Sequence, residues 1–111
     1  MDDNFQIIED FGRTLTVLYV EDNEMVREST SDMLHEYFKH IDTANDGVEG
    51  LQQYKEYHTD NKRYYDIVIT DINMPNMNGI EMIEQILELR EEQQVVIISV
   101  SYTHLTLPTK A

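Results

Sequence analysis

The sequence predicts one α/β domain, in which helices cover both faces of a parallel β-sheet. Four short apolar runs alternate with stretches of helical periodicity along the 111 residues, a pattern typical of parallel strands joined by right-handed crossovers. The runs are continuously apolar, so we expect both faces of each strand to be buried. The length allows a single domain. We place it at residues 15–99, after a polar leader at residues 1–14.

The first half of this domain is expected to hold two strands and two helices. Residues 15–20 predict the first strand, and a helix should follow over about 24–38 because apolar residues recur there at helical spacing. This stripe, which we expect to be core, consists of Val26, Thr30, Met33, Leu34, Tyr37 and Phe38. Residues 41–44 predict a short second strand. The turn signal Asn45-Asp46-Gly47 then leads to a helix over about 48–57.

The second half is expected to hold two further strands around a third helix. Residues 59–63 are predicted to form a polar loop before the third strand, residues 65–70, which ends at Asp71. Asn78 and Glu81 have the spacing of a capping box, which predicts the start of the third helix. Its expected buried face is Ile80, Ile83, Ile86 and Leu87. Residues 95–98 predict the fourth strand.

Three carboxylates follow two of these strands. Glu21 and Asp22 come directly after the first strand, and Asp71 comes directly after the third. The carboxyl ends of parallel strands share one edge of a sheet, and open α/β sheets bind their ligands there. Clustered carboxylate oxygens favour a hard cation such as Mg2+, with water and a phosphate completing its shell. The spacing therefore predicts a cation site at this edge.

The composition narrows the possible partners. Eight Lys and Arg residues against 22 Asp and Glu residues give a net charge of −14, which disfavours binding to nucleic acid or to an anionic membrane. The absence of cysteine excludes disulfides. No signal-peptide pattern and no run of membrane-spanning length is present, so we expect a cytoplasmic protein.

Two segments carry a resemblance to a known family. Residues 18–23 (LYVEDN) and 66–79 (DIVITDINMPNMNG) resemble the receiver domain of two-component response regulators, which has an acidic pair after its first strand and a D-x-x-M-P-x-M-x-G motif after its third. The resemblance implies a flavodoxin-like, doubly wound parallel sheet of order 2-1-3-4. The family's fifth β/α unit is missing here, so we expect an incomplete receiver domain.

The resemblance also implies the chemistry. A sensor histidine kinase or phosphotransfer protein would donate a phosphoryl group to Asp71, and the domain would then switch its interactions with a partner or an output domain. For Mg2+, Asp22 would be a direct ligand and Glu21 an outer one, whereas Asp71 would bind through one oxygen and Asn73 through its backbone carbonyl. Ser99 would supply the switch hydroxyl. The family's invariant lysine has no counterpart, and we do not assign its role to Lys110.

Alternative functions remain open at this point. A phosphatase with an aspartate nucleophile needs a second aspartate two residues later as general acid, and that position is Asn73. Without the acid, an aspartyl phosphate should be long-lived, which suits a signal and not an enzyme. Asn73 also weakens a Toprim-type metal site, and Asn76 stands where an EF-hand loop needs glycine. The remaining alternative is a pseudo-receiver that only binds partners, against which the intact acidic residues argue.

The last residues do not continue the α/β pattern. Residues 100–109 (VSYTHLTLPT) resemble a translated sequencing adapter, so we expect residues 100–111 to be a tail foreign to the natural domain, which should be excluded from fold reasoning. An unusual natural C-terminus is the alternative. On the first interpretation, the natural gene continues beyond Ser99.

Overall fold

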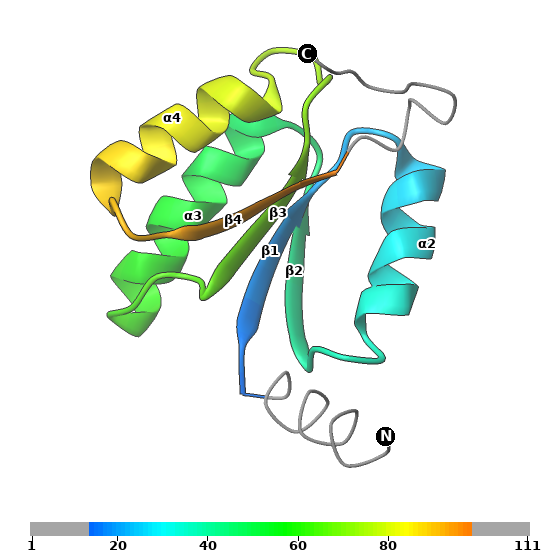
Figure 1. Cartoon of the computed structure of the whole chain (residues 1–111), viewed down its shortest axis with the longest axis horizontal. Coiled ribbons are helices and arrows are strands. Elements are labelled where there is room, and N and C mark those ends of the chain that lie inside the picture. The colour runs from blue at the N-terminus through cyan, green and yellow to red at the C-terminus, as the bar shows by residue number, and fades with distance from the viewer. Residues whose placement is uncertain (1–13, 99–111) are drawn as a thin grey trace, which may run out of the picture.

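Four parallel strands form one sheet in the order β2-β1-β3-β4, and three helices connect them (Figure 1). The structure is a computed structural model that describes residues 14–98. Its elements are β1 (Thr16–Val20), α2 (Glu24–Leu34), β2 (His40–Ala44), α3 (Gly47–Asn61), β3 (Ile67–Asp71), α4 (Gly79–Leu89) and β4 (Gln94–Ile98). The predicted fold class and strand order are confirmed. The leader, apart from Thr14, and the predicted tail with Ser99 lie outside the described residues.

The sheet separates two hydrophobic clusters, because successive residues of a strand point to opposite faces. Helices α3 and α4 lie on one face and α2 on the other (Figure 1). The larger cluster, on the α3 and α4 side, consists of Leu18, Val20, Ala44, Leu51, Tyr54, Tyr65, Val68, Met82, Ile83 and Ile86. The smaller cluster consists of Val17, Tyr19 and Ile69. All five residues of β1 are buried, as expected for a strand covered on both faces.

The helix predicted over residues 24–38 is shorter and less buried than expected. It ends at Leu34, none of its residues is fully buried, and Met33 is 54% exposed. Only Leu34 and the following Phe38 pack against the smaller cluster from this segment. Within the described residues, α2 is the single helix on its face of the sheet. The flanks of the predicted stripe therefore have no neighbouring helix to cover them.

The helix predicted over residues 48–57 is longer than expected. Helix α3 continues to Asn61 and is capped by Lys62, whose φ of 62° is left-handed, so much of the predicted 59–63 loop is helical. Side chains from its last turns explain the extension. Tyr57 stacks on Tyr65 with 4.1 Å between ring centroids. The next residue, His58, stacks on Tyr64 with 4.0 Å between ring centroids. This packing outweighs the weak helix propensity of the polar residues.

The buried face of α4 is rotated from the predicted one. Ile83 and Ile86 are buried as expected, but Ile80 and Leu87 are 41% and 38% exposed, whereas Met82 is fully buried. Helix α4 packs on α3 as well as on the sheet, and Met82 lies directly over Gly50 of α3. The glycine leaves room for the methionine side chain, so the helix turns this face inward.

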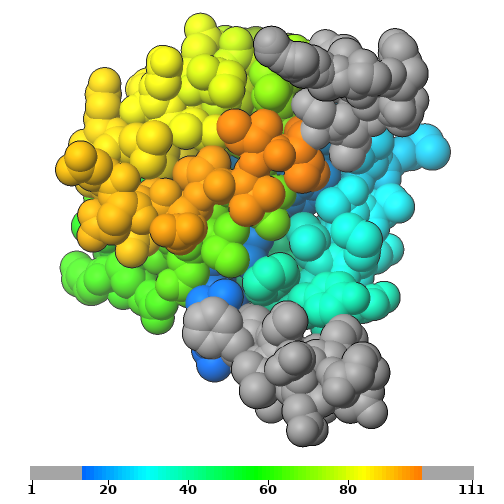
Figure 2. All heavy atoms as spheres, viewed as in Figure 1, coloured from blue at the N-terminus to red at the C-terminus, as the bar shows by residue number. Residues whose placement is uncertain are grey.

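The fourth strand is only partly covered. Val96 and Ile97 of β4 are each 46% exposed, and Figure 2 shows this strand, in orange, at the surface of the molecule. The expectation that both faces of every strand are buried is therefore wrong for β4, and also for β2, where only Ala44 is buried. Both are edge strands of the described sheet, and an edge strand has a neighbour on one side only.

Candidate metal centre

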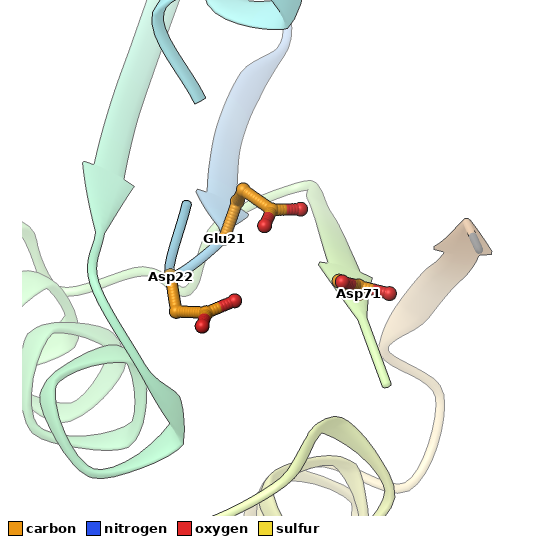
Figure 3. A group of neighbouring side chains, drawn as sticks. All are labelled: Glu21, Asp22 and Asp71. Carbon is orange, nitrogen blue, oxygen red and sulfur yellow. The ribbon is translucent and has the colours of Figure 1, made fainter. Parts of the chain in front are cut away.

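Three carboxylates meet at the carboxyl edge of the two inner strands. Glu21, Asp22 and Asp71 each offer one oxygen, and these oxygens lie within 4.8 Å of one another. Figure 3 shows Glu21 and Asp22 extending from the end of β1 toward Asp71 at the end of β3. Strands β1 and β3 are parallel neighbours, with Val20 paired to Thr70, so the residues that follow this pair lie level. The structure thus brings together the three carboxylates that the sequence singled out.

The backbone around Glu21 holds one side of its carboxylate. Glu21 is 2% exposed, and the amide of Asn23 donates to its Oε2 at 3.0 Å. The Arg27 guanidinium donates to the Glu21 backbone carbonyl at 2.9 Å, and the Glu21 amide donates to Ala44 at 3.1 Å. Oε1 of Glu21 is buried and has no hydrogen-bond partner. One oxygen is therefore fixed, and the other is available to a ligand.

Asp71 is held by the start of the next helix. It is 3% exposed, and its Oδ1 accepts a hydrogen bond of 2.7 Å from the Ile72 amide. The Gly79 amide donates to the Ile72 carbonyl at 2.8 Å, and a Cβ at Gly79 would lie 2.1 Å from the Asp71 backbone oxygen. The predicted capping box of Asn78 and Glu81 is present. Helix α4 therefore begins in direct contact with the Asp71 backbone.

A second set of contacts ties the loop after Asp71 to α3. Asn76, at a left-handed φ of 69°, donates from its side chain to Asp46 at 2.7 Å. Asp46 caps α3 by accepting from the Glu49 amide at 2.9 Å, and the Gly47 amide donates to the Met77 carbonyl at 3.1 Å. Sequence reasoning missed this link, although the turn signal at residues 45–47 marked one end of it.

Burial makes the cluster electrostatically unfavourable without a counter-charge. Desolvation raises the pKa of Glu21, the Asn23 amide partly opposes this, and the charge of Asp71 raises the pKa further. Desolvation likewise raises the pKa of Asp71, with the Ile72 amide opposing it and the charge of Asp22 adding to it. A divalent cation fits this set of hard oxygens, because it would satisfy the unpartnered Oε1 and offset the repulsion.

The other residues that the sequence singled out either adjoin Asp71 in the chain or lie outside the described residues. Asn73 is exposed and lies two residues beyond Asp71, at the position from which its backbone carbonyl was predicted to act. Thr70, predicted as a buried strand residue, is fully buried. Ser99 lies outside the described residues. Sequence reasoning missed Tyr19, a fully buried tyrosine on β1 two positions before Glu21; its signal was an aromatic hydroxyl within an apolar run.

A parallel α/β sheet with an acidic cluster at its carboxyl edge defines a class of ligand-binding domains, and comparisons with known proteins specify the family. The model of the response regulator receiver domain matches residues 17–110. The chain is 39% identical over 89 residues to the chemotaxis protein CheY of Treponema pallidum. The aligned region covers 79% of this chain and 59% of that relative. The chain therefore belongs to the response regulator receiver domain family.

Solved structures agree with this assignment. CheY in the CheX–CheY complex with BeF3 and Mg2+ from Borrelia burgdorferi is 33% identical, with a TM-score of 0.69 over 81% of this chain and 65% of that one. The receiver domain of the histidine kinase CKI1 from Arabidopsis thaliana, complexed with Mg2+ and BeF3−, shares the fold at 23% identity, with a TM-score of 0.75 over 84% of this chain and 70% of that one. Within residues 14–98, no helix combines the length and apolarity needed to cross a bilayer.

Proposed function

We propose that Asp71 accepts a phosphoryl group from the phosphohistidine of a sensor histidine kinase or phosphotransfer protein, in a Mg2+-dependent reaction. The observation that carries this proposal is the burial of Asp71 at a strand end, with oxygens of Glu21 and Asp22 within 4.8 Å. Membership of the receiver family supports it, as does the presence of BeF3 and Mg2+ with a CheY relative. Transfer would change how the domain binds a partner or an output domain in the cytoplasm.

In this reaction, Asp71 would act as the nucleophile, and its neighbours would bind Mg2+ or orient the nucleophile. A carboxylate oxygen of Asp71 attacks phosphorus, and the bond from phosphorus to the histidine nitrogen breaks as the new oxygen–phosphorus bond forms. Asp22 and Glu21 would hold Mg2+, together with one oxygen of Asp71 and the Asn73 backbone carbonyl. When bound, Mg2+ supplies positive charge against the negative charge that develops on the phosphoryl oxygens. The Ile72 amide orients the nucleophile by holding its Oδ1 at 2.7 Å.

Ser99 is proposed to respond after transfer. A phosphoryl group adds close to two negative charges and strong acceptor oxygens. The Ser99 hydroxyl would turn toward these oxygens and bias an equilibrium between two surfaces of the domain. This assignment rests on the family resemblance alone.

The test is phosphorylation by acetyl phosphate with Mg2+, followed by intact mass and peptide mapping. We expect one added phosphoryl group on Asp71 and none in Asp71→Asn. Asp60→Asn is the matched control, because Asp60 is an exposed carboxylate on α3 and its loss should change nothing. A phosphoryl group mapped to Asp22 or to a serine would remove Asp71 from its role. No mass gain under any condition would favour the pseudo-receiver alternative.

A further inference from the structure

A buried tyrosine on β1, two residues before Glu21, has no role in the chemistry described above. Tyr19 is fully buried in β1, and its hydroxyl has no hydrogen-bond partner. Within the part of the chain that the structure describes, the other buried side-chain atom in this condition is Oε1 of Glu21. A buried polar atom without a partner costs about 1–3 kcal/mol. Two such atoms on residues two positions apart are therefore an observation that needs a physical reason.

The two atoms lie on the same side of the sheet. Residues two apart on a strand point to the same face, so Tyr19 and Glu21 share the α2 face of β1. Tyr19 is paired with Ile69 of β3, which stands two residues before Asp71. Along this face, the tyrosine therefore forms the layer directly below the acidic cluster.

The electrostatics agree with this placement. Burial raises the pKa of Tyr19, and a contact with the Thr30 side chain lowers it, although this contact does not reach the geometry of a hydrogen bond. The negative charges of Glu21 and Asp71 raise the pKa further, so both carboxylates act on the hydroxyl. A phenol can donate a hydrogen bond, whereas an ionised carboxylate can only accept one. The two unpartnered atoms are thus chemically complementary.

We propose that Tyr19 is a positioning residue for the cation site, whose hydroxyl donates a hydrogen bond to Oε1 of Glu21 when the site is loaded. The inference rests on the proposed function, because it assigns Glu21 to the cation. Catalytic hydrogen bonds are often long or misaligned in an unliganded site and tighten when the ligand binds, and we expect the same of this bond to a metal ligand. With Oε2 already held by the Asn23 amide, the bond from Tyr19 would fix both oxygens and so the plane of the carboxylate.

The expected effect of losing this bond is a loss of metal affinity. Removing a residue that orients a metal ligand typically weakens metal binding about 10–100-fold. Because the Asn23 amide still holds Oε2, we expect Tyr19→Phe to lie at the lower end, about tenfold. The stability of the cation-free protein should change little, since the hydroxyl that is removed makes no well-formed hydrogen bond there.

Binding of Mn2+, which also prefers an octahedral set of oxygens, can be followed in the full chain through the electron paramagnetic resonance signal of the free ion. The matched control is Tyr54→Phe, because Tyr54 is also fully buried but its hydroxyl donates to Gln93 at 2.6 Å. We expect Tyr19→Phe to weaken Mn2+ binding about tenfold at an unchanged cation-free Tm. Tyr54→Phe should lower the Tm and leave Mn2+ affinity unchanged.

Two results would overturn the inference while leaving the proposed function intact. One is wild-type Mn2+ affinity in Tyr19→Phe. The other is a loss of affinity accompanied by a fall in Tm as large as that of Tyr54→Phe, which would make Tyr19 a general structural residue. If the wild-type chain itself binds no Mn2+, or if Glu21→Gln binds it as tightly as wild type, the assignment of Glu21 to the cation fails and the inference fails with it.

Discussion

Replacing Gly79 by alanine should displace Asp71, the proposed phosphoacceptor, without touching its side chain. The added Cβ would lie 2.1 Å from the Asp71 backbone oxygen and 3.1 Å from the Asp71 carbonyl carbon and the Ile72 Cα. Ordinary contact begins at 3.4 Å, so the oxygen and the new carbon must separate by more than an ångström. The φ of Gly79 is not positive, and lack of space is therefore the reason for glycine at this position.

The size of the expected loss of stability depends on which atoms the new Cβ contacts. Overpacking costs about 1–3 kcal/mol, and a backbone carbonyl cannot rotate away as a side chain can, so Gly79→Ala should lie at the upper end. Alanine also lowers the conformational entropy of the unfolded chain, which offsets the loss of stability by about 0.4–1 kcal/mol. The net loss is about 2 kcal/mol, which lowers the Tm of a domain of this size by about 8–16 °C. A misplacement of about 1 Å costs a reaction about 100-fold in rate.

The assay is thermal unfolding by circular dichroism, together with the initial rate of Asp71 phosphorylation by acetyl phosphate and Mg2+. Gly50→Ala is the control, because its Cβ would meet Met82 Sδ at 2.8 Å and a Val20 methyl at 2.9 Å, which are side-chain atoms. That variant also gains about 1 kcal/mol of helix propensity, so we expect a small change in Tm and a normal rate. A Gly79→Ala protein with wild-type Tm and rate would refute the argument.

Two further predictions concern the α3 cap and the sheet edge. Asp46→Ala should cost about 1–2 kcal/mol in urea unfolding at neutral pH. The Glu49 amide and then the Asn76 side chain lower the pKa of Asp46 in the folded protein. The stability that Asp46 contributes should therefore be complete above the usual aspartate pKa of about 3.9 and be lost as the pH falls through the lower folded pKa. A stability difference between wild type and Asp46→Ala that persists in strong acid would contradict this. An exposed apolar edge strand such as β4 favours pairing between copies of the chain, so we expect some self-association, and Ile97→Lys should reduce it in sedimentation experiments because a charged edge resists strand pairing. Val48→Lys, at a 48% exposed site on α3, should leave self-association unchanged. If both variants reduced self-association equally, the β4 edge would be excluded as its cause.

The sequence predicted those parts of the fold that depend on local pattern. Apolar runs located β1, β3 and β4, the short segment 41–44 located β2, and the spacing of Asn78 and Glu81 located the start of α4. The sequence was a poorer guide to helix ends and buried helix faces that depend on packing against neighbouring elements. Stacking of aromatic rings extended α3 beyond its predicted end, and the room above Gly50 turned Met82 inward in place of Ile80. Such effects depend on residues far away in the chain, so helical periodicity alone cannot reveal them.

The candidate site was predictable to the extent that strand ends define it. Glu21, Asp22 and Asp71 follow two strands that proved to be neighbours, and parallel pairing brought them together. The supports of these residues were not predictable in the same way. The contact of Asn76 with Asp46 joins residues 30 positions apart, and the unpartnered state of the Tyr19 hydroxyl depends on packing around it. The role of Ser99 stays a prediction.

The strand order has a consequence for how the domain opens. Strands β1 and β3 are the inner pair, and each is hydrogen-bonded on both sides, whereas β2 and β4 have one neighbour each in the described sheet. Partial unfolding proceeds through the least supported elements, so either outer strand can separate while Val20 and Thr70 remain paired. Amide hydrogens of the inner strands should therefore exchange with solvent last, and the acidic cluster should persist in partly opened molecules.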